Sequence, residues 1–195
     1  MIKIGFKFPD FSLPDQNGAS HTLSQYTEKW LIIYFYPRDN TSGCSLEASN
    51  FAGLIKKYAT RNTNVIGVSA DSVKSHAKFA ERMALPFTLL SDAEHSLSEA
   101  GGIWQKKTIA GKEYMGIVRS TYILDPQSVV RASWTRVKID GHAEEVLAKT
   151  QRTPGIRQLK YLGDVFDNVF PTLPLFWITI IVMLKAGCIG PRPKA

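Results

Sequence analysis

The stretch of residues 31–51 constrains the fold more than any other part of the chain. It opens with residues 31–36, which are apolar on both faces and rich in β-branched and aromatic side chains. Such a run predicts a central strand that is covered on both sides. Pro37 ends the strand because it lacks the N–H that a sheet ladder needs. Turn-forming residues follow over 39–43, and an amphipathic run over 45–58 predicts a helix.

Cys44 stands where this loop meets the helix. Free backbone N–H groups and the positive end of the helix dipole lie at such a junction. Both favour the thiolate over the thiol, and the thiolate is the nucleophilic form of cysteine. Taken alone, however, the position fits a small packed hydrophobe as well as it fits a reactive thiol. The neighbouring residues therefore have to decide between the two interpretations.

The rest of the chain alternates strands with helices. Residues 4–30 suit two short strands joined by an Asn-Gly turn at Asn17. Further strands are predicted over 64–69, 86–91, 120–125 and 129–139, and further helices over 73–83, 93–100 and 142–149. This order predicts an α/β fold in which helices cover both faces of a central mixed sheet.

Composition bounds the remaining choices. At 195 residues we expect one folded domain, residues 1–152, and an extension, residues 153–195. The net charge is +7, but no basic run is interleaved with aromatic residues, so we expect no nucleic acid as partner. Two cysteines give no disulfide framework and the N-terminus has no apolar signal region, so a cytoplasmic location is favoured. The four histidines lack metal-ligand spacing; we interpret them as surface or supporting residues and expect no metal or other cofactor.

Two residues upstream of Cys44 complete the pattern Pro37-x-x-x-Thr41-x-x-Cys44. The Thr41 hydroxyl can hydrogen-bond the sulfur or an oxygen that approaches it. In this pattern the chain resembles the peroxiredoxins, and more narrowly the bacterioferritin-comigratory-protein branch, also called peroxiredoxin Q. The resemblance covers about residues 4–150 and rests on four segments in the family's order and spacing: 8–18, 35–41, 114–121 and 137–142.

The resemblance implies a thioredoxin-like fold and a thiol-specific peroxidase that reduces hydrogen peroxide and organic hydroperoxides. Cys44 is then the peroxidatic nucleophile, Pro37 shields it, and Thr41 and Arg119 position and polarise the peroxide. Without its motif, Arg119 would be interpreted as a surface residue of a strand, and Thr41 as a turn or cap residue. Glu47, one helical turn after Cys44, either holds an arginine in place or is an exposed helix charge.

The chain departs from the family at residue 49. Many relatives carry a second cysteine five residues after the first, which resolves the sulfenic acid as a disulfide, whereas this chain has Ser49. We therefore expect thioredoxin, glutaredoxin or glutathione to reduce the sulfenic acid of Cys44. Cys188 is the only internal candidate for a resolving thiol, and we interpret it as a bystander. The alternative function is a redox sensor or membrane-associated binding module that oxidises without efficient turnover.

The extension contains an uninterrupted apolar run, residues 175–184. As a helix this run is about 15 Å long, and a membrane span needs roughly 20 residues. Extended to residues 169–190 it becomes marginal. Three interpretations stay open: a membrane-associated tail, an apolar segment packed on the domain or on a twin subunit, and an extension with no selected role. For the oligomeric state we expect a monomer or a weak homodimer.

Overall fold

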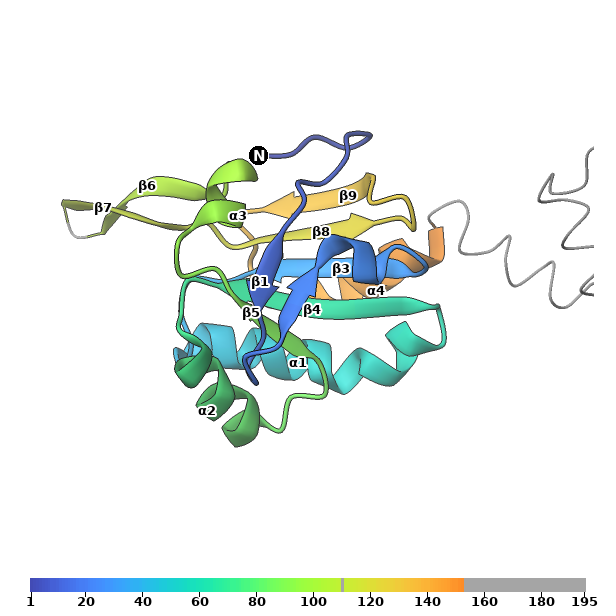
Figure 1. Cartoon of the computed structure of the whole chain (residues 1–195), viewed down its shortest axis with the longest axis horizontal. Coiled ribbons are helices and arrows are strands. Elements are labelled where there is room, and N and C mark those ends of the chain that lie inside the picture. The colour runs from blue at the N-terminus through green and yellow to red at the C-terminus, as the bar shows by residue number, and fades with distance from the viewer. Residues whose placement is uncertain (110, 153–195) are drawn as a thin grey trace, which may run out of the picture. The chain divides into compact units, whose positions relative to one another are not determined.

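The computed structural model describes residues 1–109 and 111–152 (Figure 1). The elements follow in the order β1 (Ser12–Pro14), β2 (Ser20–Thr22), the 3-10 helix η1 (Leu23–Tyr26), β3 (Trp30–Phe35), α1 (Ser42–Ala59), β4 (Thr63–Ser69), α2 (Val73–Met83), β5 (Thr88–Ser91), α3 (Ser96–Ala100), β6 (Trp104–Ile109), β7 (Lys112–Ile117), β8 (Ser120–Leu124), β9 (Val130–Thr135) and α4 (His142–Arg152). The predicted alternation of strands and helices is confirmed. The expectations for the extension, for its apolar segment 169–190 and for Cys188 fall outside the described residues.

Five strands form a mixed sheet in the order β5-β4-β3-β8-β9. The central strand, β3, runs parallel to β4 and antiparallel to β8. All six residues of β3 are buried, which explains why this part of the sequence is apolar on both faces. Phe35 at the end of β3 lies opposite Ser120 at the start of β8. The residues just after Phe35 and just before Ser120 therefore meet at one end of the central strands.

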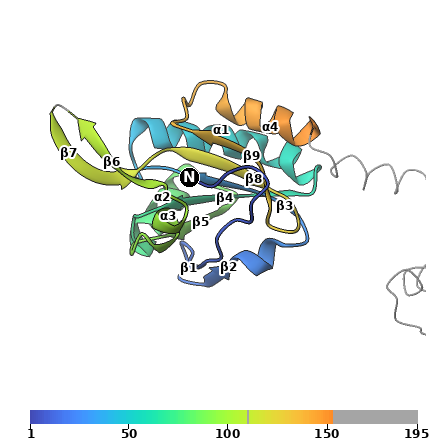
Figure 2. The same ribbon diagram turned by 90° about the horizontal axis from the view of Figure 1, so that it is seen from above.

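Separate sets of elements cover the two faces of the sheet. Helices α1 and α4 lie on one face, and the β1–β2 hairpin and α3 lie on the other (Figures 1 and 2). On the first face, the rings of Tyr34 and Phe51 stack with centroids 4.8 Å apart. On the second face, Phe8 meets Tyr122 edge-on at 5.6 Å. Because both faces of β3 are packed, the sheet holds the loop that follows β3 in a fixed place.

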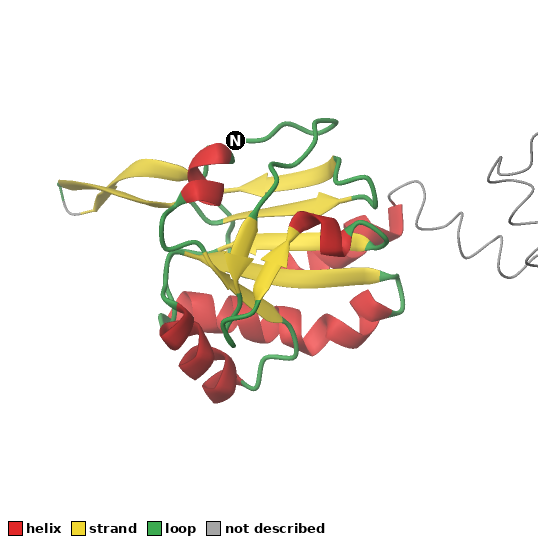
Figure 3. Ribbon diagram, in the orientation of Figure 1, coloured by secondary structure: helices red, strands yellow, loops and turns green. Residues whose placement is uncertain are grey.

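Some predicted bounds are wrong: β9 ends at Thr135 and not at residue 139, and α3 begins at Ser96 and not at residue 93. Two further differences bear on the site. Helix α1 begins at Ser42, and not at residue 45, because Thr41 caps it and accepts the N–H of Cys44. Cys44 is therefore inside the first turn of the helix. Strands β6 and β7 form an unpredicted antiparallel hairpin that projects from the body of the molecule (Figure 3). Over residues 1–109 and 111–152, no helix combines the length and the apolar character that crossing a membrane requires.

Candidate active site

Cys44 lies beyond the carboxyl end of β3, in the first turn of α1, and is only 2 % exposed. Thr41 is the N-cap of this helix and has an extended backbone. Its Oγ1 accepts the Cys44 N–H at 3.4 Å, and its hydroxyl donates to the Arg38 carbonyl at 3.2 Å. Thr41 thus has the capping role that the sequence had left open, and its oxygen is held beside the turn that carries the sulfur.

Arg119 comes directly before β8 and reaches the sulfur from the neighbouring strand. Its Nη2 donates to Cys44 Sγ at 3.2 Å, and its Nη1 donates to Glu47 Oε2. The side chain is only 15 % exposed. The interpretation of Arg119 as a surface strand residue is therefore wrong. One guanidinium therefore contacts two residues of α1 at the end of the central strands.

Glu47 faces inward from α1, and its side chain is 2 % exposed. The alternative of an exposed helix charge is therefore wrong. Burial raises the pKa of Glu47 to about 7, although the neighbouring Arg119 acts to lower it. Burial also opposes the charge of Arg119, but Glu47 and Cys44 outweigh it and raise the pKa of Arg119. The guanidinium therefore stays charged beside the sulfur.

The residues around this cluster fit closely. A Cβ placed on Gly43 would lie 2.9 Å from Cδ1 of Ile139 and 3.8 Å from Nη2 of Arg119. A side chain at residue 43 would therefore crowd Ile139. Pro37 and Arg119 line the same cleft. Lys107 of the β6–β7 hairpin also borders it, and its Nζ donates to the Ile117 carbonyl. No sequence pattern predicts a role for Lys107, because none marks the hairpin that carries it.

A buried polar network holds the loop between β3 and α1. Asp39 Oδ2 accepts from Ser75 Oγ at 2.7 Å and from His76 Nδ1 at 2.9 Å, and the Asp39 N–H donates to Asp71 at 2.8 Å. The other ring nitrogen of His76 lies 3.2 Å from the Leu90 carbonyl. Burial opposes the charge of Asp39, but the hydrogen bond and the charge of His76 outweigh it and lower the pKa of Asp39. The loop that carries Pro37 and Thr41 is thereby fixed to α2.

Of the four histidines, interpreted above as surface or supporting residues, two are not at the surface. His76 and His142 are buried, and His142 Nε2 lies 2.8 Å from Thr121 Oγ1. Burial lowers the pKa of His142. Among the residues that the structure describes, no three His, Cys, Asp or Glu side chains are grouped closely enough to hold a metal ion.

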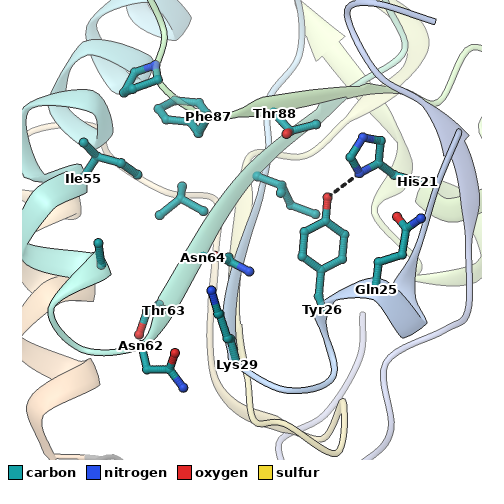
Figure 4. Close-up of a pocket in the computed structure, with 14 residues that line it drawn as sticks. His21, Gln25, Tyr26, Lys29, Ile55, Asn62, Thr63, Asn64, Phe87 and Thr88 are labelled. Atoms are coloured by element: carbon teal, nitrogen blue, oxygen red, sulfur yellow. Dashed lines mark hydrogen bonds between the residues drawn. The ribbon is translucent and has the colours of Figure 1, made fainter. Parts of the chain in front are cut away.

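A second hollow, of about 450 Å³, lies at the amino-terminal end of strands β3, β4 and β5, and Figure 4 shows the residues that line it. Its wall includes Asn62 and Thr63, at the start of β4, and Phe87. His21 Nδ1 lies 2.8 Å from the Tyr26 hydroxyl at its rim. None of the residues predicted to act at the site lines this hollow. The predicted site residues therefore do not extend to this hollow and lie near Cys44, at the carboxyl end of β3.

The chain is similar to known proteins in sequence and in fold. The model of the AhpC/TSA family matches residues 4–133, which include Cys44 and Arg119. Peroxiredoxin Bcp of Bacillus subtilis (strain 168) is 44 % identical over 146 residues, which are 75 % of this chain and 93 % of that protein. Peroxiredoxin Bcp of Xanthomonas campestris is 40 % identical over 139 residues, which are 71 % of this chain and 87 % of that protein.

Two solved structures from Xanthomonas campestris are also similar. The structure of peroxiredoxin Q has a TM-score of 0.70 and 38 % identity, and the match covers 73 % of this chain and 90 % of that one. A structure of the bacterioferritin comigratory protein, solved in work on its alkyl peroxide reduction activity, has a TM-score of 0.70 and 37 % identity with the same coverage. The predicted thioredoxin-like architecture agrees with both.

Proposed function

Because the chain belongs to the AhpC/TSA family, in its peroxiredoxin Bcp branch, and is therefore a thiol peroxidase, we propose that Cys44 is its peroxidatic cysteine. One observation carries the proposal: Arg119 Nη2 lies 3.2 Å from Cys44 Sγ. A guanidinium is always charged, so it stabilises a thiolate at this distance. In the described part of the chain no other cysteine is present.

The proposed reaction is an in-line displacement. The Cys44 sulfur attacks one peroxide oxygen, an S–O bond forms, and the O–O bond breaks. Two electrons pass from sulfur to oxygen, and the departing oxygen takes up a proton and leaves as water or an alcohol. Negative charge grows on this oxygen in the transition state, and Arg119 is a donor placed beside the reacting sulfur.

The other predicted residues have supporting roles in this proposal. Thr41 Oγ1, held at the helix cap, is an acceptor for the O–H of the peroxide. Pro37 lines the approach to Arg119 and shields the sulfur from water. Glu47 positions Arg119, because its buried carboxylate accepts from Nη1 while Nη2 faces the sulfur. We take hydrogen peroxide and organic hydroperoxides as substrates, and the alkyl peroxide reduction of the Xanthomonas campestris relative supports the second class.

We propose that an external thiol recycles Cys44, with thioredoxin, glutaredoxin and glutathione as candidates. The residue five positions after Cys44 is Ser49, and the only other cysteine of the sequence is Cys188. A local disulfide of the kind that residue 49 gives in many relatives is therefore not available. The presence of Ser49 also favours a second candidate function, a redox sensor that is oxidised once and turns over poorly.

Steady-state oxidation of NADPH with thioredoxin, its reductase and hydrogen peroxide separates the two functions. A peroxidase gives many turnovers per chain, and the Cys44→Ser protein gives none. Oxidation that stops after one equivalent, with both thioredoxin and dithiothreitol, would contradict the peroxidase. A matched Cys188→Ser protein tests the resolving role of that residue, and unchanged turnover would exclude it. Cell fractionation tests the proposed cytoplasmic location, against which recovery in the membrane pellet would count.

A further inference from the structure

A cleft of about 540 Å³ lies between the β6–β7 hairpin, the end of β9 and the segments that follow β3 and precede β8. Ten residues line it, and four of them are cationic: Lys106, Lys107, Arg119 and Arg136. None of the ten is acidic. We call these four residues and the space between them the basic cleft. Its volume is in the range of pockets that hold small organic ligands.

Two of the four cations already have anionic partners. Lys106 Nζ lies 2.5 Å from Glu113 Oε2 on the same hairpin, and Arg119 is paired with Glu47. For Lys107 and Arg136, the structure of residues 1–109 and 111–152 shows no ion pair. Burial lowers the pKa of Lys107, and repulsion from Arg119 lowers it further. An anion entering the cleft would relieve this repulsion between cations.

The position of the cleft indicates which reactant carries the anion. Hydrogen peroxide is uncharged, so two unpaired cations do little for its binding. The sulfenic acid of Cys44, in contrast, is reached by a thiol from outside in the proposed cycle, and the described residues hold no second cysteine. Cys44 is only 2 % exposed, which favours a small thiol over a bulky one. Arg119 both lines the cleft and donates to Cys44 Sγ at 3.2 Å, so a thiol held in the cleft lies beside the residue that contacts the sulfur.

We propose that the basic cleft binds the carboxylate of a small thiol that reduces oxidised Cys44. This inference rests on the proposed peroxidase function and specifies the reductant for the same site. Lys107 and Arg136 hold the carboxylate. Arg119 remains at the sulfur. The ligand class is therefore a low-molecular-weight thiol with at least one carboxylate.

The recycling step has a defined balance. The thiolate of the bound reductant attacks Cys44 Sγ, an S–S bond forms, and the S–O bond breaks. The oxygen leaves with a proton as water. A second thiolate then attacks the sulfur of the first reductant, which releases a small disulfide and restores the Cys44 thiolate. Two thiols are oxidised to one disulfide for each peroxide reduced.

Three thiols of similar size test the charge preference: 3-mercaptopropionate, 2-mercaptoethanol and cysteamine, which carry negative, no and positive charge beside the thiol. The full chain is oxidised with one equivalent of hydrogen peroxide, and the loss of the sulfenic acid is followed for each thiol at equal thiolate concentration. We expect the anionic thiol to react faster than the cationic one, by roughly two- to fivefold for each cation engaged. The difference shrinks in salt, because the Debye length is about 10 Å at 0.1 M.

The three thiols also differ in intrinsic reactivity, so we compare the wild type with variants. For each protein we take the ratio of the rate with 3-mercaptopropionate to the rate with cysteamine, and intrinsic reactivity cancels when these ratios are compared. Arg136→Gln and Lys107→Gln lower this ratio, Arg136→Lys retains it, and Arg136→Glu reverses the preference towards cysteamine. The matched control is Lys57→Gln, which removes the same charge from an exposed position in the last turn of α1 and leaves the ratio unchanged. Circular dichroism of each variant reports whether it is folded.

Two results would overturn the proposal. One is an equal ratio in the wild type, in Arg136→Gln and in Arg136→Glu while all three proteins turn over. The other is a charge preference that appears only in the oxidation of Cys44 by a carboxylate-bearing hydroperoxide, which would assign the cleft to the peroxide. Absence of turnover with every thiol, dithiothreitol included, would instead refute the peroxidase function itself.

Discussion

Replacing Arg119 tests the geometry of the site at its most specific contact. In the structure this guanidinium donates to Cys44 Sγ at 3.2 Å and to Glu47 Oε2. Arg119→Met keeps much of the side-chain length and apolar stem, but it removes both donors and the charge. Arg119→Lys keeps the charge but offers a single ammonium group in place of a planar fork.

The size of the effect follows from the contact that is lost. A preorganised donor at the site of developing negative charge contributes about 3–4 kcal/mol to the transition state, which is about 100- to 1000-fold in rate. We expect a loss of this size in the second-order rate constant of Arg119→Met with hydrogen peroxide. Arg119→Lys should fall between this variant and the wild type, because a lysine cannot bridge Cys44 and Glu47 with two separate nitrogens.

The assay is rapid mixing of the reduced protein with peroxide, followed by trapping of the sulfenic acid and mass spectrometry of the intact chain. Urea unfolding run in parallel separates loss of rate from loss of folded protein. Glu47→Gln tests the positioning role separately: it removes the negative charge beside Nη1 but leaves the guanidinium and an acceptor oxygen, so its loss of rate should be smaller than that of Arg119→Met. A folded Arg119→Met protein that reacts within threefold of the wild type would refute the reasoning.

Two further predictions follow from buried groups of the site, and a third follows from Ser49, which is exposed on α1. The pKa of Glu47 is raised from 4.5 to about 7. Between these two pH values the folded chain therefore keeps a proton that the unfolded chain has released. The free energy of unfolding should fall as the pH rises from 4.5 to about 7, by at most about 3 kcal/mol. Glu47→Gln should lack this fall in urea titrations at pH 5 and 8, and parallel pH profiles would contradict the prediction. His76→Phe removes the ring nitrogen that lies 2.9 Å from the buried Asp39 Oδ2 and should lower the free energy of unfolding by about 1–3 kcal/mol, whereas an unchanged urea midpoint would argue against a stabilising role of this contact. Ser49→Cys places two cysteines five residues apart in α1, about 7.5 Å along its axis, which is beyond the reach of a disulfide. The disulfide should therefore form only when the helix opens, and peptide mapping at successive times after oxidation measures its rate of formation. A disulfide that forms as fast as Cys44 reacts with the peroxide would contradict this.

Much of the fold could be predicted because local patterns agree with the tertiary structure. The apolar run at residues 31–36 became the buried central strand, and the periodic run at 73–83 became α2 with the same bounds. The start of α1 was misplaced, because the capping hydrogen bond of Thr41 draws three more residues into the helix. The β6–β7 hairpin was missed because no apolar alternation or turn pair marks its strands strongly.

The site could be predicted from the sequence only in part. The motif around Cys44 is local, but Arg119 lies 75 positions further on, and only the register of β8 against β3 brings it to the sulfur. For Glu47 the sequence left two alternatives, because the spacing from Cys44 cannot tell which side of a helix is buried. The hydrogen bond between Asp39 and His76 joins two segments 37 positions apart, and neither residue lies in a pattern that predicts burial.

The most direct test of the account is to find where the first equivalent of peroxide goes. The reduced full-length protein is mixed with one equivalent of hydrogen peroxide, the sulfenic acid is trapped, and the modified residue is located by peptide mass spectrometry. The account predicts that Cys44 carries the modification and that the Cys44→Ser protein leaves the peroxide unconsumed. Modification of Cys188 with Cys44 untouched, or rapid consumption of peroxide by Cys44→Ser, would contradict it.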